Sequence, residues 1–220
     1  MNQATQTTRQ RIIDAAGDIF GKQGFKAATV REICTYAGVN LAAVNYYFGG
    51  KQQLYREVAS DLIAKTFERF PLDQGVTAAD PPQKRLKAFI LAILQRLLTP
   101  GGFAGFTGKG QLVARELADP SPILDDLINS FLRPTAAVLA GIIAELLGPR
   151  ASQKEIVRCQ VSVIGQCFHY ALARPILTRL VALDYREKGF IVKLAEHVTR
   201  FSLAGIDAIK AQIDARDADG

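Results

Sequence analysis

The 220-residue sequence contains no tryptophan, a single methionine and only three cysteines. Cys34, Cys159 and Cys167 are odd in number and far apart, which excludes a dense disulfide framework and favours free thiols in a reducing compartment. Cys159, Cys167 and His169 lack both the spacing and the fourth ligand of a zinc site. We therefore expect neither a structural metal nor a cofactor.

Long apolar runs and catalytic signatures are also missing. The longest uncharged apolar run, 136–144, is far shorter than the roughly 20 residues that a membrane-spanning helix needs. The N-terminus has no apolar core region, so we expect no signal peptide. The chain has no Gly-x-Ser-x-Gly or His-Glu-x-x-His motif and no nucleophile–base spacing. These absences predict a cytoplasmic protein that is neither membrane-bound nor an enzyme.

Positive charge is concentrated towards the N-terminus. Residues 1–56 hold seven Lys or Arg and three Asp or Glu, so a quarter of the chain carries +4 of the net +6. Such a bias is typical of a protein that binds a polyanion such as double-stranded DNA. A solvated basic face would give the same count, so the charge alone does not decide between the two.

Apolar residues recur with the period of an α-helix along most of the chain, and no segment alternates with the period of a strand. We therefore predict an all-α fold. The first helix is expected to end near Gly21 and Gly24, because glycine tolerates the left-handed conformation found there. The predicted helices lie at residues 8–22, 41–48, 51–70, 83–99, 110–118, 121–147, 153–173 and 187–213, with a further one beginning at Thr29.

Residues 29–48 have the pattern of a helix-turn-helix unit. Thr29 and Glu32 predict a capping box, in which each side chain accepts a hydrogen bond from the other residue's amide. Residues 37–39, Ala-Gly-Val, predict a tight turn, and Asn40 is suited to cap the helix that follows. The second helix of such a unit lies in the major groove of DNA, and we call it the reader helix.

Periodicity assigns the faces of the reader helix. Val44, Tyr47 and Phe48 are spaced to form its buried face. The residues left on or near the outer face are Leu41, Ala42, Ala43, Asn45 and Tyr46. The two alanines allow a close approach to the bases, and the Asn45 amide can pair with adenine or hold a phosphate. The Tyr46 side chain can contact a phosphate or a thymine methyl group.

Phosphate contacts are predicted on both sides of the reader helix. Lys51, at the start of the next helix, is placed for a backbone phosphate. Thr29, with the amides that begin its helix, is placed for a phosphate on the other side. Asn40, at the start of the reader helix, completes the predicted interface with double-stranded DNA.

The pattern is continuous over about residues 8–67 and resembles the N-terminal domain of TetR-family regulators. The matching residues include Ile12, Ala16, Phe20, Gly24, Thr29, Ile33, Ala37, Phe48, Lys51 and Leu54. The resemblance implies a homodimer, a three-helix reader and a helical C-terminal domain that binds a small ligand. It also implies that the stretch contacting DNA includes Ala43, Asn45, Tyr46, Tyr47 and Lys51. One departure is Val44-Asn45, where the family commonly has Leu-Tyr, so an amide replaces an aromatic phosphate contact.

Residues 111–121 and 162–170 resemble the C-terminal domain of the CecR-like branch, which is linked to antibiotic sensitivity. The resemblance implies an amphiphilic or aromatic inducer. Since small-molecule pockets are mostly apolar with a few polar groups, we assembled candidates by residue type. They are Phe103, Phe106, Phe131, Phe168 and Tyr170, with Arg115, Gln166 and His169 as polar partners. The alternative is that the aromatics are core residues and that Arg115 and Glu116 form a surface pair.

The segment 102–110 is rich in glycine but lacks the glycine spacing, the Ser or Thr and the preceding strand of a phosphate-binding loop. We interpret it as a mobile loop near a ligand entrance.

Pro71–Pro82 is the best boundary, which predicts a DNA-binding domain at 8–67 and a ligand-binding and dimerisation domain at 83–213. Segments 121–147 and 153–173 are unusually apolar, and surplus apolar surface on a helix needs a partner. The last two long helical segments are therefore the candidates for a two-fold dimer interface. The hypothesis is a homodimeric repressor on a pseudo-palindromic operator, released by a small-molecule inducer. The alternatives are an activator or other DNA-binding factor, and a small-molecule carrier whose helix-turn-helix is only structural.

Overall fold

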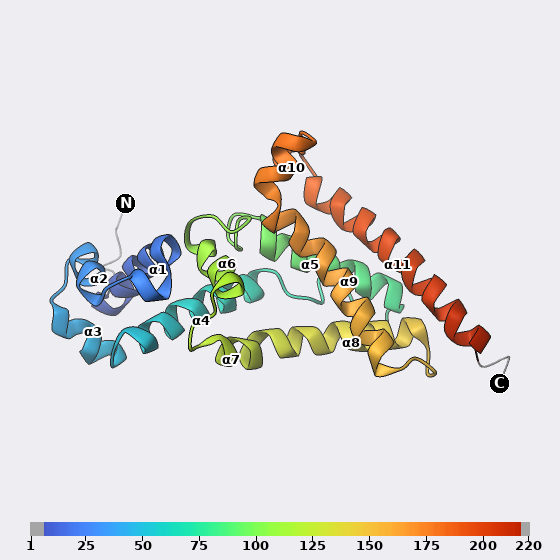
Figure 1. The fold of residues 1–220 in the computed structure, drawn as a ribbon, viewed down its shortest axis with the longest axis horizontal. Helices are drawn as coiled ribbons and strands as arrows, with labels where there is room; N and C mark the ends of the chain where they lie inside the picture. The colour runs from blue at the N-terminus through green and yellow to red at the C-terminus, as the bar shows by residue number, and fades with distance from the viewer. Residues whose placement is uncertain (1–6, 217–220) are drawn as a thin grey trace.

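A computed structural model describes residues 7–216, and Figure 1 shows its ribbon. The described part of the chain forms helices and no β-strand, which confirms the predicted all-α fold. The elements are α1 (Thr8–Ala27), α2 (Val30–Ala37), α3 (Leu41–Phe48), α4 (Lys51–Arg69), α5 (Pro82–Leu98), η1 (Gly108–Gly110), α6 (Gln111–Ala118), α7 (Leu124–Leu127), η2 (Ile128–Leu132), α8 (Arg133–Leu147), α9 (Gln153–Leu172), α10 (Arg174–Leu180) and α11 (Phe190–Arg216).

The molecule is elongated, and α4 connects its two ends (Figure 1). Helices α1, α2 and α3 form a small cluster at one end, with α1 packed on both α2 and α4. Helices α5, α8, α9 and α11 pack together at the other end. Helix α6 and η1 lie between them and contact α1. A single apolar core therefore runs from Ile12 in α1 to Ile213 in α11.

The first helix extends further than its glycines predict. Thr7 caps it by accepting a hydrogen bond from the Gln10 amide at 3.3 Å. The helix passes through Gly21 and breaks its regular geometry only at Gly24, where φ is +80°. A last turn then continues to Ala27. Glycine serves here as a kink and not as a stop, because the chain resumes helical geometry after the one residue with positive φ.

The local signals around α2 and α3 are confirmed. Thr29 Oγ1 accepts from the Glu32 amide at 3.2 Å, and Glu32 Oε2 accepts from the Thr29 amide at 2.9 Å. The Glu32 carboxylate accepts from both the hydroxyl and the amide of Thr29, and these two bonds hold the pKa of Glu32 below its usual range. Gly38 ends α2 in the left-handed region, and Asn40 caps α3 by accepting from the Ala43 amide at 3.0 Å.

Two long predicted helices differ from their expected form. The segment predicted at 121–147 consists of α7, a single π-helical stretch (η2) and α8, which begins just before Pro134. The predicted 187–213 helix begins instead at Phe190, as α11. Helix α10 was not predicted, and it contains Pro175 close to its start. In the structure that proline lies in the first turn of α10, where its missing N–H costs no hydrogen bond.

One segment, Leu124–Leu147, is long and apolar enough to cross a membrane by length and composition alone. About 22% of its most apolar window is buried inside the structure. Part of the remaining apolar surface faces a cavity, since Leu124, Leu127 and Leu132 line that space.

Candidate functional site

The outer face of α3 is open and carries no charge. Leu41, Ala42, Asn45 and Tyr46 are exposed, and Ala43 is partly exposed. Val44 and Phe48 are buried beneath them and attach the helix to the core. The helix therefore presents small, amide and aromatic side chains outward, a set suited to base edges and phosphates.

Tyr47 does not lie where periodicity places it. The expectation of a buried side chain is wrong, since Tyr47 is 40% exposed and Tyr46 is 83% exposed. The two rings meet edge to face with centroids 4.9 Å apart. A helix of only eight residues is held by the narrow stripe of Val44 and Phe48, so the position between them turns outward with its neighbour. Tyr47 nevertheless stays within the stretch predicted to contact DNA.

The predicted phosphate ligands flank α3 but already have partners. The Lys51 ammonium donates to the carbonyl of Lys26 at 3.2 Å and lies 4.8 Å from the centroid of the Phe25 ring. The Thr29 hydroxyl donates to Glu32, and the Asn40 side chain is engaged in capping. All three side chains are partly or largely exposed at the N-terminal turns of α2, α3 and α4.

Arg11 fixes the turn between α2 and α3. Its Nη2 atom donates to the carbonyls of Ala37 at 2.5 Å and Gly38 at 3.0 Å. These carbonyls lie at the C-terminal end of α2, where a helix has acceptors without internal partners. A cation at this end is also favoured by the helix dipole. The relative orientation of α2 and α3 thus depends on a residue of α1.

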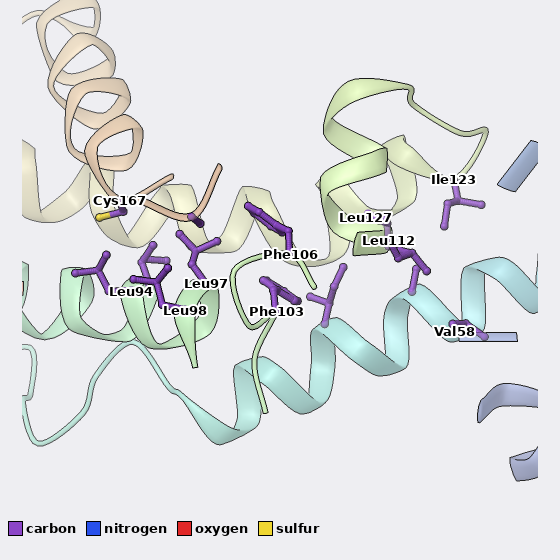
Figure 2. Packing of buried hydrophobic residues seen from close by; sticks show 14 of the residues in the cluster. Val58, Leu94, Leu97, Leu98, Phe103, Phe106, Leu112, Ile123, Leu127 and Cys167 are labelled. Atoms are coloured by element: carbon purple, nitrogen blue, oxygen red, sulfur yellow. The ribbon is translucent and has the colours of Figure 1, made fainter. Parts of the chain in front are cut away.

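A cavity of about 600 Å³ is bounded by residues of α4 to α9. Its wall is almost entirely apolar and includes Phe67, Phe89, Phe103, Leu112 and Phe168. Figure 2 shows Phe103 and Phe106 between α5 and α6, with Leu97 and Leu112 nearby. The volume lies within the range of roughly 300–1,000 Å³ typical of small-molecule sites.

The predicted ligand residues are only partly brought together here. Phe103 and Phe168 line the cavity. Phe106 stacks on Phe103 at 6.4 Å between centroids and lies 6.2 Å from Phe168, so it backs the wall. Phe131 packs edge to face on the cavity residue Phe67, with the centroids 5.8 Å apart.

The remaining predicted ligand residues lie outside the cavity wall. The Gln166 side chain donates to Ser202 Oγ and to the carbonyl of Ser162. The backbone carbonyl of Tyr170 accepts from the Tyr185 hydroxyl at 2.7 Å, and His169 is exposed on α9. Gln166, His169 and Tyr170 are not among the residues that line the cavity.

Arg115 contacts α1 and does not line the cavity. Its Nε atom donates to the carbonyl of Gly21 at 3.1 Å and Nη2 to that of Lys22 at 2.5 Å. Those carbonyls lie just before the kink at Gly24, where intrahelical donors are missing. A second contact is the ion pair between Lys109 of η1 and Asp14 of α1, at 3.1 Å. Helix α6 is thereby attached to the helix that carries Arg11.

Glu116, the next residue, is buried, so the alternative of a surface pair is wrong. Its Oε1 accepts from the Tyr55 hydroxyl of α4 at 2.5 Å. Its Oε2 accepts from the amide and hydroxyl of Ser121, both at 3.1 Å. Burial, reinforced by this carboxylate, raises the pKa of Tyr55 far above its usual range. Glu116 also lines the cavity, so its hydrogen bond with Tyr55 connects α6 to α4 at the cavity wall.

The glycine-rich segment is packed and not free at the surface, which corrects the interpretation as a mobile loop. Phe103 and Phe106 are buried, and η1 lies against α1. The approach is so close that a Cβ on Gly21 would lie 2.8 Å from the carbonyl oxygen of Gly108. The Phe103 amide donates to the carbonyl of Arg96 at 2.7 Å, which fixes the segment to α5.

Arg96 is the functional candidate that sequence reasoning missed. It lies in α5 on the cavity wall and is only 4% exposed. Its Nε atom donates to the carbonyl of Phe70 at 2.9 Å, and its guanidinium carbon lies 3.6 Å from the centroid of the Phe67 ring. In an amphipathic helix that also carries Lys84, Arg85 and Lys87, Arg96 is expected to be a surface cation, and only long-range packing shows otherwise.

Within residues 7–216, no group of three or more His, Cys, Asp or Glu side chains is arranged to hold a metal ion.

Comparison with known proteins divides the chain in two. Residues 12–58 match the model for bacterial regulatory proteins of the tetR family. Residues 82–206 match the model for the C-terminal domain of the HTH-type transcriptional dual regulator CecR.

Individual relatives agree with the two models. The dual regulator CecR of Shigella flexneri is 25% identical over 174 residues, which is 77% of this chain and 78% of that protein. The transcriptional repressor NicS of Pseudomonas putida is 34% identical over 90 residues, which is 40% of this chain and 42% of that protein.

Solved structures share the fold at lower identity. A TetR-like transcriptional regulator from Rhodococcus sp. RHA1 superposes with a TM-score of 0.64 at 14% identity, covering 94% of this chain and 99% of that one. The transcriptional regulator FadR of Bacillus subtilis, solved in complex with stearoyl-CoA, gives 0.60 at 17% identity, covering 89% and 97%.

Proposed function

The chain belongs to the TetR family of bacterial transcriptional regulators and has a CecR-like C-terminal domain, and from this premise we propose that it is a homodimeric repressor. In this proposal residues 8–67 bind a pseudo-palindromic operator, and residues 83–213 dimerise and bind an inducer in the 600 Å³ cavity. Occupation of the cavity releases the operator. The protein acts in the cytoplasm, where its DNA lies.

DNA binding is supported most directly by the outer face of α3. An open face with small side chains at Ala42 and Ala43 can approach base edges closely. Asn45 and Tyr46 supply an amide and a hydroxyl on that face, and Lys51 lies at its edge. The absence of acidic residues from Leu41–Phe48 removes any repulsion from the phosphates.

Exposed apolar surface supports the dimer. At the end of α9 Leu172 is 54% exposed, and on α11 Phe201 is 65% exposed. A Cβ added at Gly205 on α11 would meet no atom within 4 Å. Helices with free apolar surface and room for close approach suit packing against a second copy about a two-fold axis. Such symmetry places two reader helices about one turn of DNA apart.

Helix α6 supports the coupling between inducer and operator. One side of it, through Leu112, Val113 and Glu116, lines the cavity. The other, through Arg115, holds the end of α1. A ligand that displaces this short helix therefore acts on α1. Because such coupling is reciprocal, operator DNA must weaken inducer binding by the factor by which inducer weakens DNA binding.

The decisive experiment is selection of genomic fragments by the purified full-length protein at physiological salt. We expect one enriched pseudo-palindromic motif, and a double variant, Asn45→Ala with Tyr46→Ala, that stays folded and does not enrich it. A reporter controlled by that motif then separates a repressor from an activator. Enrichment of nothing above background would instead favour the small-molecule carrier.

A further inference from the structure

The cavity wall contains four polar side chains, and three of them form hydrogen bonds and have no buried polar atom without a partner. Glu116 accepts from Tyr55 and Ser121. The Thr135 hydroxyl and the Gln160 amide both donate to backbone carbonyls, at 2.9 and 2.8 Å. The fourth is Arg96.

The Arg96 guanidinium is incompletely satisfied. Its Nη1 atom is buried, and no hydrogen-bond partner lies within reach among residues 7–216. Two other arginines there have a buried unpartnered nitrogen, but neither Arg56 nor Arg85 lines the cavity. The guanidinium carbon lies 3.6 Å from the centroid of the Phe67 ring, and Arg96 and Phe67 are both residues of the cavity wall, so the charged end lies directly behind or beside that wall.

Arg96 is also unpaired in charge, since it forms none of the ion pairs found in the described part of the chain. Burial lowers its pKa to about 10, which leaves it protonated at neutral pH. A buried cation without a counter-charge is costly, and stacking on Phe67 with one bond to Phe70 offsets only part of that cost. An oxyanion from a ligand would supply both the missing acceptor and the charge.

We propose that the cavity binds an amphiphilic anion whose oxyanion head accepts from Arg96 and whose apolar body lies along Phe89, Phe103 and Phe168. The apolar wall excludes a compact, fully hydrated anion, and the buried cation disfavours a cationic amphiphile. This inference rests on the proposed function, because it names the chemical class of the inducer of that same cavity.

The test compares ligands of one chain length that differ only in the head group. Dodecanoate, dodecyl phosphate and dodecanol are titrated calorimetrically, below their aggregation concentrations, into the full-length protein. We expect the better of the two anions to bind at least about tenfold more tightly than dodecanol, the minimum for one charge-assisted hydrogen bond. The stronger anion identifies the head group as a carboxylate or a phosphate. Equal affinity of both anions and the alcohol overturns the proposal.

Variants test whether Arg96 is the residue responsible for the preference for anionic head groups. Arg96→Gln should reduce the preference for the anion to within about twofold while dodecanol binding is retained, and Arg96→Lys should keep part of it. Arg85→Gln removes the same charge from α5 outside the cavity and should keep all of it. An undiminished preference in Arg96→Gln sinks the assignment. If that variant does not fold, the comparison of Arg96→Lys with wild type decides.

Operator selection by the same preparations separates this inference from the proposed function. Intact operator selection without any preference for anions overturns only the ligand class. A preference for anions in a protein that selects no operator supports the ligand class and overturns the repressor.

Discussion

The hydroxyl of Tyr55 donates to the carboxylate of Glu116 across a buried contact of 2.5 Å. Tyr55 belongs to α4, which begins beside the reader helix, and Glu116 belongs to the cavity wall. The ring of Tyr55 also packs edge to face on Phe20 of α1, with centroids 4.7 Å apart. One side chain of α4 thus contacts both α1 and α6, the elements that connect cavity and reader in the proposed function.

Tyr55→Phe removes this hydrogen bond while keeping the ring. We expect a loss of about 1–3 kcal/mol of unfolding free energy, since the buried Glu116 loses one of its donors. We also expect the effect of a cavity ligand on operator affinity to shrink. Calorimetric unfolding and operator titrations with and without dodecanoate measure the two effects. A variant with wild-type coupling would show that the signal bypasses this bond.

A matched pair of substitutions on α3 and α4 tests the DNA interface. Asn45→Ala should cost about 1–3 kcal/mol on the selected operator and little on random DNA, if the amide contacts a base. Lys51→Ala should weaken binding to every duplex. It should also reduce the slope of the logarithm of the binding constant against the logarithm of salt concentration by about one. Lys84→Ala, which removes the same charge from α5, serves as the control. Retained selectivity in Asn45→Ala would assign base recognition to other residues of the face.

Gly38 is required at the turn for two separate reasons. Its φ of +64° is left-handed, and an added Cβ would lie 2.8 Å from Nη2 of Arg11. Gly49 has a similar φ of +73° but free space around it. We expect Gly49→Ala to cost about 1 kcal/mol from backbone strain, and Gly38→Ala to cost more and to lower operator affinity. Equal losses in thermal unfolding would mean that the Arg11 side chain moves aside freely.

The sequence predicted the features that depend on near neighbours. The capping box of Thr29 and Glu32, the turn at Gly38 and the Asn40 cap are each decided within a few residues, and the structure has all of them. The resemblance to a known family added the fold and the arrangement of its two parts.

The residues that line the cavity could not be predicted from residue type in the same way. Arg115 and Arg96 are both basic residues in amphipathic helices, yet one contacts α1 and the other is buried at the cavity wall. The difference depends on contacts with residues more than 20 positions away, such as Phe70 and Gly21. Periodicity alone also misplaced Tyr47, because a two-turn helix buries only a narrow stripe.

The three cysteines should be protected in the folded protein. Cys34, Cys159 and Cys167 are all buried, and burial raises the pKa of each thiol. At pH 8 we expect slow reaction with a chromogenic disulfide reagent, followed by rapid release of three equivalents in denaturant. Rapid reaction of one thiol in native buffer would indicate local opening of the helix that carries it.

Cys167 should also make stability depend on alkaline pH. Burial raises its pKa to about 12, whereas a thiol in the unfolded chain titrates near about 8.5. The folded state therefore binds a proton that the unfolded state has lost, so stability is intact below about pH 8.5 and falls as the pH rises towards 12. At pH 10 the loss from this group is about 2 kcal/mol. Urea unfolding at pH 7 and pH 10 measures it.

Cys167→Ala separates this effect from other alkaline titrations. At pH 7 the variant should be less stable than the wild type, because a fully buried side chain is shortened. Its unfolding free energy should nevertheless fall less between pH 7 and pH 10 than that of the wild type, and the difference between the two falls is the contribution of the thiol. Tyr55 also has a raised pKa, so some alkaline loss must persist in the variant. If the unfolding free energy falls equally in both proteins, the thiol ionises in the folded state and α9 opens to water at Cys167.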